Sequence, residues 1–440
     1  MTSCLLALFG NNFQIFAASG DCFRSLPSED EAGDRINEEL IARLLDLAKD
    51  LDASAADIVL ALFQIPENQW PVVLARQNQD GNTLLHWAAW FAEGAMLMFN
   101  VAVILSEDQL MELLMINNND EETPFDWAME CVDPEINFLK IIVQKLFPQQ
   151  LEMFLVTPNP FNGNVPLHMA ADSLNGAALI ELVYTNLPNR LFDLLWVPEG
   201  EDGHILFHDA ANSSYGGACL RAVAGKLLPG QLLSLLKAQR EFDKTTPLHD
   251  AVNSEYGEEF LLAVEEVLPG QLHTLLKRAD RNGATPLHYM IASPYGIAIL
   301  KMLGKILPRK LSRALKKADK SGKTSLHYAV ESPDGAEILG VVGGILPWGQ
   351  FANLLKKADK NGKTPLHYAV ESPGGAEILG VVGGILPSEQ FASLLREVDQ
   401  NGKTPLHYVV ESPDGAEILE VVEGILPSGQ LASFLRKAVF

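Results

Sequence analysis

The sequence predicts an all-α protein, a solenoid of stacked helical repeats with about nine units and three helices in each unit. Three observations predict it. The 40 residues 359–398 are nearly repeated in the 40 residues on either side. The same frame continues upstream with increasing divergence, in steps of 39 to 42 residues. Within the units, apolar residues recur at the spacing of an α-helix.

One position marks every unit, and histidine occupies it in eight of the nine. A unit of this size has an apolar stripe on each helix and cannot cover all of them alone, so neighbouring units must stack. We therefore expect one continuous core along the array. The marker residues are His86, Asp126, His168, His208, His249, His288, His327, His367 and His407.

The repeated 40-residue sequence shows the predicted helices most clearly. Thr364 is a good N-cap and Pro365 suits the first helical position, so a short helix is predicted to run to about Glu371. The apolar i, i+3, i+4 pattern that follows predicts a second helix, which stops at Pro387. We expect Ser388 to cap a third helix with the same apolar spacing.

The string D-x-x-G-x-T-P-L-H-x-A resembles the signature of ankyrin repeats. It is complete at residues 359–369 and intact at 280–290 except for Met290. The resemblance covers about 360 residues and implies an ankyrin-type solenoid, in which the marker histidine hydrogen-bonds turn backbone and ties neighbouring units together. The units are longer than the family's, which have about 33 residues. We expect a third helix to replace much of the usual hairpin finger.

The long unit also resembles the ankyrin effectors that intracellular bacteria such as Legionella deliver into host cells.

The repeat frame divides the chain into three parts. Residues 1–27 form an unassigned leader, 28–80 a degenerate N-terminal capping repeat, and 81–440 the nine ankyrin-like repeats. Helices of the capping repeat are expected near 36–49, 54–64 and 68–76.

The charge of the chain argues against nucleic acid as a partner. The net charge is -23, and residues 1–160 hold 7 Lys and Arg against 25 Asp and Glu, or -18. Such a surface repels phosphate, because affinity for it comes from Lys and Arg. One basic band interrupts the acidic chain, either as a solvated face or as a site for an acidic partner. It includes Lys301, Lys305, Arg309, Lys310 and Arg313.

Nothing in the sequence predicts insertion into a membrane, since no run of about 18 apolar residues occurs. The apolar first nine residues lack the basic start of a signal peptide. Four cysteines without metal-like spacing fit a reducing compartment. We expect a cytosolic protein, and any export into a host cytoplasm would need a specialised secretion system.

Two features of the sequence could indicate chemistry instead of a structural role. His204 and His208, beside Asp202 and Asp209, are spaced like zinc ligands, but His204 is expected in a turn and need not share a face with His208. The alternative to a binding protein is an enzyme, with its site hidden in the N-terminal region or in an irregular repeat. A catalytic domain needs about 100 residues, and only about 27 lie outside the frame. We therefore expect that the protein is not an enzyme and binds neither a cofactor nor a metal.

The ankyrin resemblance implies a protein-protein interaction scaffold that binds a partner protein on its concave face. If the protein is a bacterial effector, that partner is a host protein. That face is lined by turn residues and by the two positions four and five after each marker. Exposed aromatic residues there carry about 2 kcal/mol or more each, although they could instead pack beneath the long units. Trp90 and Phe91 are expected to anchor the partner. The candidate residues are Trp90, Phe91, Glu130, Phe161, Asp172, Asn212, Phe242, Asn253 and Arg281.

Overall fold

The chain divides into two compact units, Met1–Arg43 and Leu44–Phe440, and the repeated helices lie in the second. The structure is a computed structural model. It describes residues 41–45, 55–91, 94–131, 136–159, 163–412, 414–427 and 429–431. These residues contain helices and no strand, with only two isolated β-bridges, at Glu199–His204 and Ala318–Thr324. The predicted leader, 1–27, lies outside this part of the chain.

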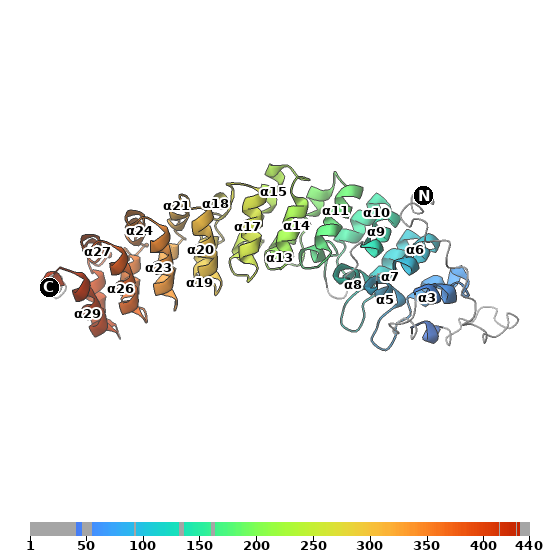
Figure 1. The fold of residues 1–440 in the computed structure, drawn as a ribbon, viewed down its shortest axis with the longest axis horizontal. Coiled ribbons are helices and arrows are strands. Elements are labelled where there is room, and N and C mark those ends of the chain that lie inside the picture. Colours follow the sequence, from blue (N-terminus) through green and yellow to red (C-terminus); the bar gives the residue numbers. More distant parts are fainter. Residues whose placement is uncertain are drawn as a thin grey trace. The chain divides into compact units, whose positions relative to one another are not determined.

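Helices follow one another in sets of three along the array (Figure 1). The first helices of the units are α5 (Leu84–Trp90), α8 (Pro124–Glu130), the 3-10 helix η4 (His168–Ala171), α13 (Leu206–Ala210), α16 (Pro247–Ala251), α19 (Pro286–Ala292), α22 (Ser325–Ala329), α25 (Pro365–Ala369) and α28 (Pro405–Tyr408), which the 3-10 helix η5 (Val409–Glu411) continues. The second helices are α6 (Ala95–Ile104), α9 (Asn137–Lys145), α11 (Gly176–Asn186), α14 (Gly216–Val223), α17 (Gly257–Val267), α20 (Gly296–Ile306), α23 (Gly335–Ile345), α26 (Gly375–Ile385) and α29 (Gly415–Ile425). The third helices are α7 (Glu107–Leu114), α10 (Pro148–Val156), α12 (Leu191–Leu194), α15 (Pro229–Leu235), α18 (Leu272–Leu275), α21 (Leu311–Leu315), α24 (Trp348–Leu355) and α27 (Ser388–Leu394).

Equivalent helices of neighbouring units pack against one another. α5 packs on α8, α23 on α26, and α24 on α27, and the first and second helices keep this order along the described array. Leu379 and Val382, on one face of α26, are completely buried by this stacking. The predicted all-α repeat solenoid, with a third helix in its units, is confirmed.

A glycine begins most of the second helices because the first helix passes very close to it. A Cβ added at Gly216 would lie 1.6 Å from the carbonyl oxygen of Ala210, and one at Gly257 would lie 1.6 Å from that of Ala251. No side chain fits at such a distance. The tight crossing of first and second helices therefore depends on glycine in these units.

The marker histidines tie units together through the backbone, as the ankyrin resemblance implies. The Nδ1 atom of His249 accepts a hydrogen bond from the backbone N–H of Thr246 at 3.0 Å. Its Nε2 atom contacts the carbonyl of Ala284 in the next unit at 3.3 Å. The ring of Tyr289 packs edge-on against His249 with centroids 5.1 Å apart, and its hydroxyl donates to Asp280 at 2.9 Å. The Nε2 atoms of His86, His288, His327 and His367 contact the carbonyls of Glu122, Lys323, Lys363 and Lys403.

Some predicted helix ends shift by one or two residues. Thr364 caps α25 as predicted, but the helix ends at Ala369, before Glu371. Ser388 is the first residue of α27 and not its cap, because Pro387 occupies the N-cap position. The expected hydroxyl cap is wrong, and this helix begins without a side-chain hydrogen bond.

Upstream of the nine units, the structure describes helix α3 (Ala55–Leu62), the 3-10 helix η2 (Glu67–Gln69) and α4 (Trp70–Leu74). α3 packs on α6, and α4 packs on α7. These are the contacts that second and third helices make elsewhere in the array. The division at residues 28 and 81 stays a prediction. Among the helices described here, none is long and apolar enough to cross a membrane.

Candidate functional site: an acidic groove lined by tryptophans

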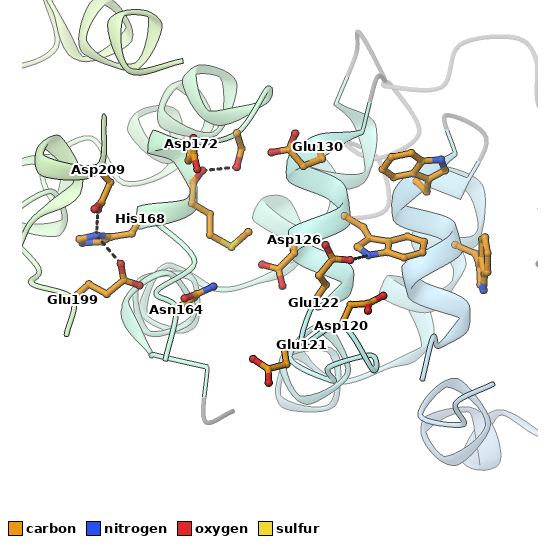
Figure 2. A pocket seen from close by; sticks show the side chains of 15 residues that line it. Asp120, Glu121, Glu122, Asp126, Glu130, Asn164, His168, Asp172, Glu199 and Asp209 are labelled. Atoms are coloured by element: carbon orange, nitrogen blue, oxygen red, sulfur yellow. Dashed lines mark hydrogen bonds and ion pairs between the residues drawn. The ribbon is translucent and has the colours of Figure 1, made fainter. Parts of the chain in front are cut away.

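A groove of about 1170 Å³ runs across the first helices and turns of four successive units, starting at α5 (Figure 2). Of its 15 lining residues, eight are acidic and none is Lys or Arg. We call it the acidic groove. Its acidic residues are Asp120, Glu121, Glu122, Asp126, Glu130, Asp172, Glu199 and Asp209. The others are Trp87, Trp90, Trp127, Asn164, His168, Met169 and Ser173.

The repeat itself aligns one row of the groove. Trp90, Glu130 and Asp172 each stand four residues after the marker of their unit, and all three are exposed side chains in the lining. Because the first helices stack in register, equivalent positions from successive units lie next to one another. Three of the residues chosen from the sequence as partner contacts therefore lie in the groove lining, and their role in binding stays a prediction.

Three tryptophans form one wall of the acidic groove. The ring of Trp127 lies 5.5 Å from that of Trp87 and 5.7 Å from that of Trp90, both edge-on. The indole N–H of Trp127 donates to Glu122 at 2.7 Å, which holds that carboxylate against the wall. Trp90 is 48% exposed. The buried indole N–H of Trp87 has no hydrogen-bond partner among the described residues.

Negative charge accumulates in the groove without a neutralising Lys or Arg in its lining. Burial raises the pKa of Glu130, and the charges of Asp172 and Glu122 raise it further against a hydrogen bond from Ser173. Burial also raises the pKa of Asp126, despite hydrogen bonds from Thr123. A cation that entered the groove would relieve this repulsion.

Glu121 holds a strained backbone conformation in the turn that borders the groove. Its φ is 65°, in the left-handed region, where Gly81 and Gly163 stand at the equivalent positions of the adjacent units. A side chain in this region costs on the order of 1 kcal/mol or more. The turn keeps a carboxylate at a position where glycine would be more stable.

At its far end the acidic groove meets a pair of histidines. His168 Nδ1 lies 2.8 Å from Asp209 Oδ2 and 3.3 Å from Glu199 Oε2, and Figure 2 shows both contacts. His204 Nε2 lies 3.3 Å from Glu199 and 3.4 Å from Asp209. We call these four residues the two-histidine cluster.

The cluster shifts the pKa values of its members. Burial opposes the charged form of His168, but hydrogen bonds to Asp209 and Glu199 outweigh it and raise the pKa to about 9. The hydrogen bond to Glu199 is the largest cause that raises the pKa of His204 to about 9. Burial of Glu199 is likewise outweighed by both histidines, which lower its pKa to about 2.

His204 and His208 do not form the zinc-like pair that their spacing in the sequence suggested. His208 is buried, and its Nδ1 accepts a hydrogen bond from the backbone N–H of Ile205. His204 instead faces His168 of the preceding unit, with ring centroids 5.8 Å apart. Sequence spacing could not reveal this partner, because the two histidines are 36 residues apart.

The remaining candidate residues lie outside the groove lining. Phe91 is half-buried and stacks on Trp87 at 6.4 Å, facing a small cavity instead of the groove. Phe242 is 74% exposed, and the guanidinium of Arg281 lies over its ring at 5.2 Å. Asn212 and Asn253 are exposed. Phe161 lies outside the described residues.

The groove also contains residues that the sequence analysis did not select. Asp120, Glu121 and Glu122 follow one another in a turn, and this acidic run was the signal that could have identified them. Trp127 follows Trp87 by 40 residues, the length of one unit. Glu199 carries no comparable signal, and the sequence pointed to Asp209 only as a neighbour of the His204 and His208 pair.

The described cysteines do not suit nucleophilic catalysis. Burial raises the pKa of the Cys219 thiol to about 12, and the thiolate is the reactive form. Cys131 is also buried, and its thiol contacts the carbonyl of Trp90 at 3.1 Å. Cys22 lies outside the described part of the chain.

The helix order and the groove define a helical repeat protein with an acidic surface across its first units. No protein-family model matches the chain, and no curated protein matches it. The chain is similar to the solved ankyrin repeat domain of Bcl-3, a member of the IkappaB protein family, with 20% identity, a TM-score of 0.34, and 59% of this chain and 97% of that chain covered. It is similar to an ankyrin repeat protein from Leishmania major with 16% identity, a TM-score of 0.37, and 62% and 97% covered. The all-α repeat architecture follows from the order and contacts of the described helices.

Proposed function

We propose that this protein is a protein-protein interaction scaffold whose acidic groove binds a Lys- and Arg-rich segment of a partner protein. The observation that supports it is the lining itself, eight carboxylates and three tryptophans with no Lys or Arg. Carboxylates pair with ammonium and guanidinium groups, and an indole face attracts the same cations.

The size of the groove fits a peptide segment better than a single side chain. It crosses four units, and about 1170 Å³ is more than a small-molecule pocket of typical size. Trp90 and Trp127 offer stacking surface near α5 and α8, while Glu130 and Asp172 supply charge along the row. Aromatic anchors give most of the affinity in such interfaces, and charge gives on-rate and selectivity.

Replacing Trp90 with alanine is expected to weaken binding of a labelled Lys- and Arg-rich peptide by roughly 10- to 30-fold, since an interface anchor contributes about 2 kcal/mol. Raising the salt concentration should weaken binding further, because exposed charges are screened. Fluorescence anisotropy with the purified chain measures both effects. Asn253→Ala is the control, an exposed candidate residue outside the groove lining.

A Glu- and Asp-rich peptide of equal length tests the sign of the charge. If Trp90→Ala weakens binding of the acidic peptide as much as that of the basic one, or if Trp90→Ala and Asn253→Ala bind the basic peptide equally well, the proposed use of the groove is wrong. Circular dichroism of each variant separates loss of binding from loss of fold.

Glu121→Gly is expected to raise the stability of the chain while lowering its affinity for the basic peptide. Glycine removes the strain of the left-handed conformation, worth about 1 kcal/mol, and it also removes a carboxylate from the lining. Urea unfolding and peptide anisotropy report the two effects separately. Gain of stability with unchanged affinity would mean that Glu121 takes no part in binding.

The proposal extends to two finer points. The first is that the basic band binds an acidic partner. This is supported by the exposure of all its named residues, Lys301, Lys305, Arg309, Lys310 and Arg313. The second is that the protein acts as a bacterial effector in host cytosol, and the support is the resemblance of its long units. The acidic peptide described above tests the basic band directly, with Arg309→Glu and Arg313→Glu as the variants.

A further inference from the structure

The two-histidine cluster has the donor atoms and the spacing of a metal site. The four atoms that face one another are His168 Nδ1, His204 Nε2 and one carboxylate oxygen each from Glu199 and Asp209, all within 4.8 Å of one another. Four nitrogen and oxygen ligands about 2.0 to 2.1 Å from a zinc ion would stand about 3.4 Å apart at the corners of a tetrahedron. Contacts from Glu199 to both histidines are 3.3 Å, and that from His204 to Asp209 is 3.4 Å.

Both imidazole rings are held by a second acceptor, as metal-bound histidines are. His168 Nε2 donates to the backbone carbonyl of Val197 at 2.8 Å, which turns Nδ1 toward the cluster. His204 Nδ1 pairs with the carboxylate of Asp202 at 2.8 Å, which turns Nε2 toward the cluster. Such outer partners fix ring orientation in metal sites. The orientation of each ring is therefore set before any ion binds.

The backbone around the cluster departs from the rest of the array. In other units the marker histidine accepts a hydrogen bond from the backbone N–H of the N-cap residue of its own helix. In the unit of His168 the equivalent N–H, that of Val165, donates instead to the carboxylate of Glu199 at 2.5 Å. Its first helix is the short 3-10 helix η4. The contacts that stabilise an ordinary unit are thus exchanged here for contacts to the two-histidine cluster.

We propose that His168, Glu199, His204 and Asp209 bind one divalent transition-metal ion of the zinc class. Imidazole and carboxylate ligands together suit Zn²⁺ and its first-row neighbours. With four protein ligands the site is structural, since catalytic zinc sites keep a position open. The ion would fasten the turn at Glu199 and His204 to η4 on one side and to α13 on the other, where the usual cap is missing.

The ion pairs of the cluster could also satisfy these groups without a metal, and the experiment must separate the two cases. The purified full-length chain is treated with a chelator, dialysed, and titrated with Zn²⁺ by isothermal calorimetry. One ion per chain is expected. Thermal unfolding should shift to higher temperature with added Zn²⁺, because a ligand that binds only the folded state stabilises it.

Variants identify the ligands. His204→Gln lies in a partly exposed turn, so it should keep the fold and lower Zn²⁺ affinity by at least 100-fold. Asp202→Asn, which loses only the outer partner, should lower the affinity by roughly 10- to 100-fold. Two controls should bind as the parent chain does, His273→Gln, a histidine outside the cluster, and Glu130→Gln, a carboxylate elsewhere in the groove.

Several results would overturn the proposal. The chain could bind no Zn²⁺, in which case the cluster is an ion-pair network only. His204→Gln could bind as well as the parent chain, or Glu130→Gln could bind as weakly as His204→Gln, which would point to diffuse attraction by the acidic groove. Co²⁺ gives an independent readout, since the visible absorption of tetrahedral Co²⁺ should appear in the parent chain and be absent in His204→Gln.

Discussion

Lowering the pH from 7 to 4 is expected to cost the folded chain about 6 kcal/mol through His86 and His249 alone, at about 3 kcal/mol each. Burial lowers the pKa of His86 to about 4, although its contact with the carbonyl of Glu122 raises it in part. Burial lowers the pKa of His249 to about 4 in the same way, against the carbonyl of Ala284. The same cause lowers the pKa of His288, His327 and His367.

The sign of the effect follows from the hydrogen bonds. His249 Nδ1 accepts the N–H of Thr246, so it bears no proton in the folded chain, and adding one would break the helix cap. In the unfolded chain the same ring takes up a proton near pH 6.5. Below that pH the unfolded state binds more protons than the folded state, so stability falls as pH falls, until the folded histidine titrates near 4.

Urea unfolding at pH 7 and pH 4 measures the loss, and His249→Gln isolates one histidine. Acidification also reduces the repulsion within a chain of net charge -23, but this affects the parent and the variant alike. The stability advantage of the parent over His249→Gln should therefore shrink by about 3 kcal/mol between pH 7 and pH 4. An advantage that stays constant would mean that the neutral ring is not what the fold requires.

The fold could be predicted from the sequence because the helix caps and the apolar spacing recur with the same 40-residue period as the repeat. Thr364 and Pro365 start α25, and the apolar spacing of α26 is the spacing of its buried face. What the sequence missed has a physical origin. Ser388 is a residue type that often caps helices, but Pro387 occupies the N-cap position of α27 with an extended backbone. Ser388 is therefore already inside the first turn, where its hydroxyl does not cap the helix.

Of the residues that line the acidic groove, the sequence selected only the row that the period aligns. Trp90, Glu130 and Asp172 share one position in three units, so stacking the units was sufficient to bring them together. His168 could not be predicted in the same way. In the sequence it is a histidine at the marker position, like those of the other units. Only the path of the chain through η4 turns its Nδ1 atom away from the backbone and toward Asp209.

Trp70→Ala is expected to lower the free energy of unfolding by about 3 to 5 kcal/mol, the cost of emptying a buried aromatic site. Trp70 is completely buried in α4, and its indole N–H donates to the carbonyl of Ile65 at 3.2 Å. The matched control is Val72→Ala in the same helix, where 46% exposure predicts a change within about 0.5 kcal/mol.

This variant also tests whether residues 28–80 cap the array. A terminal unit covers apolar surface that its neighbour would otherwise expose, and here α3 covers α6 while α4 covers α7. If the segment is a cap, Trp70→Ala should speed amide hydrogen exchange in α6 and α7 as well as in α4, while α23 keeps its protection. Faster exchange confined to 55–74 would make the segment an appended element on which the array does not depend.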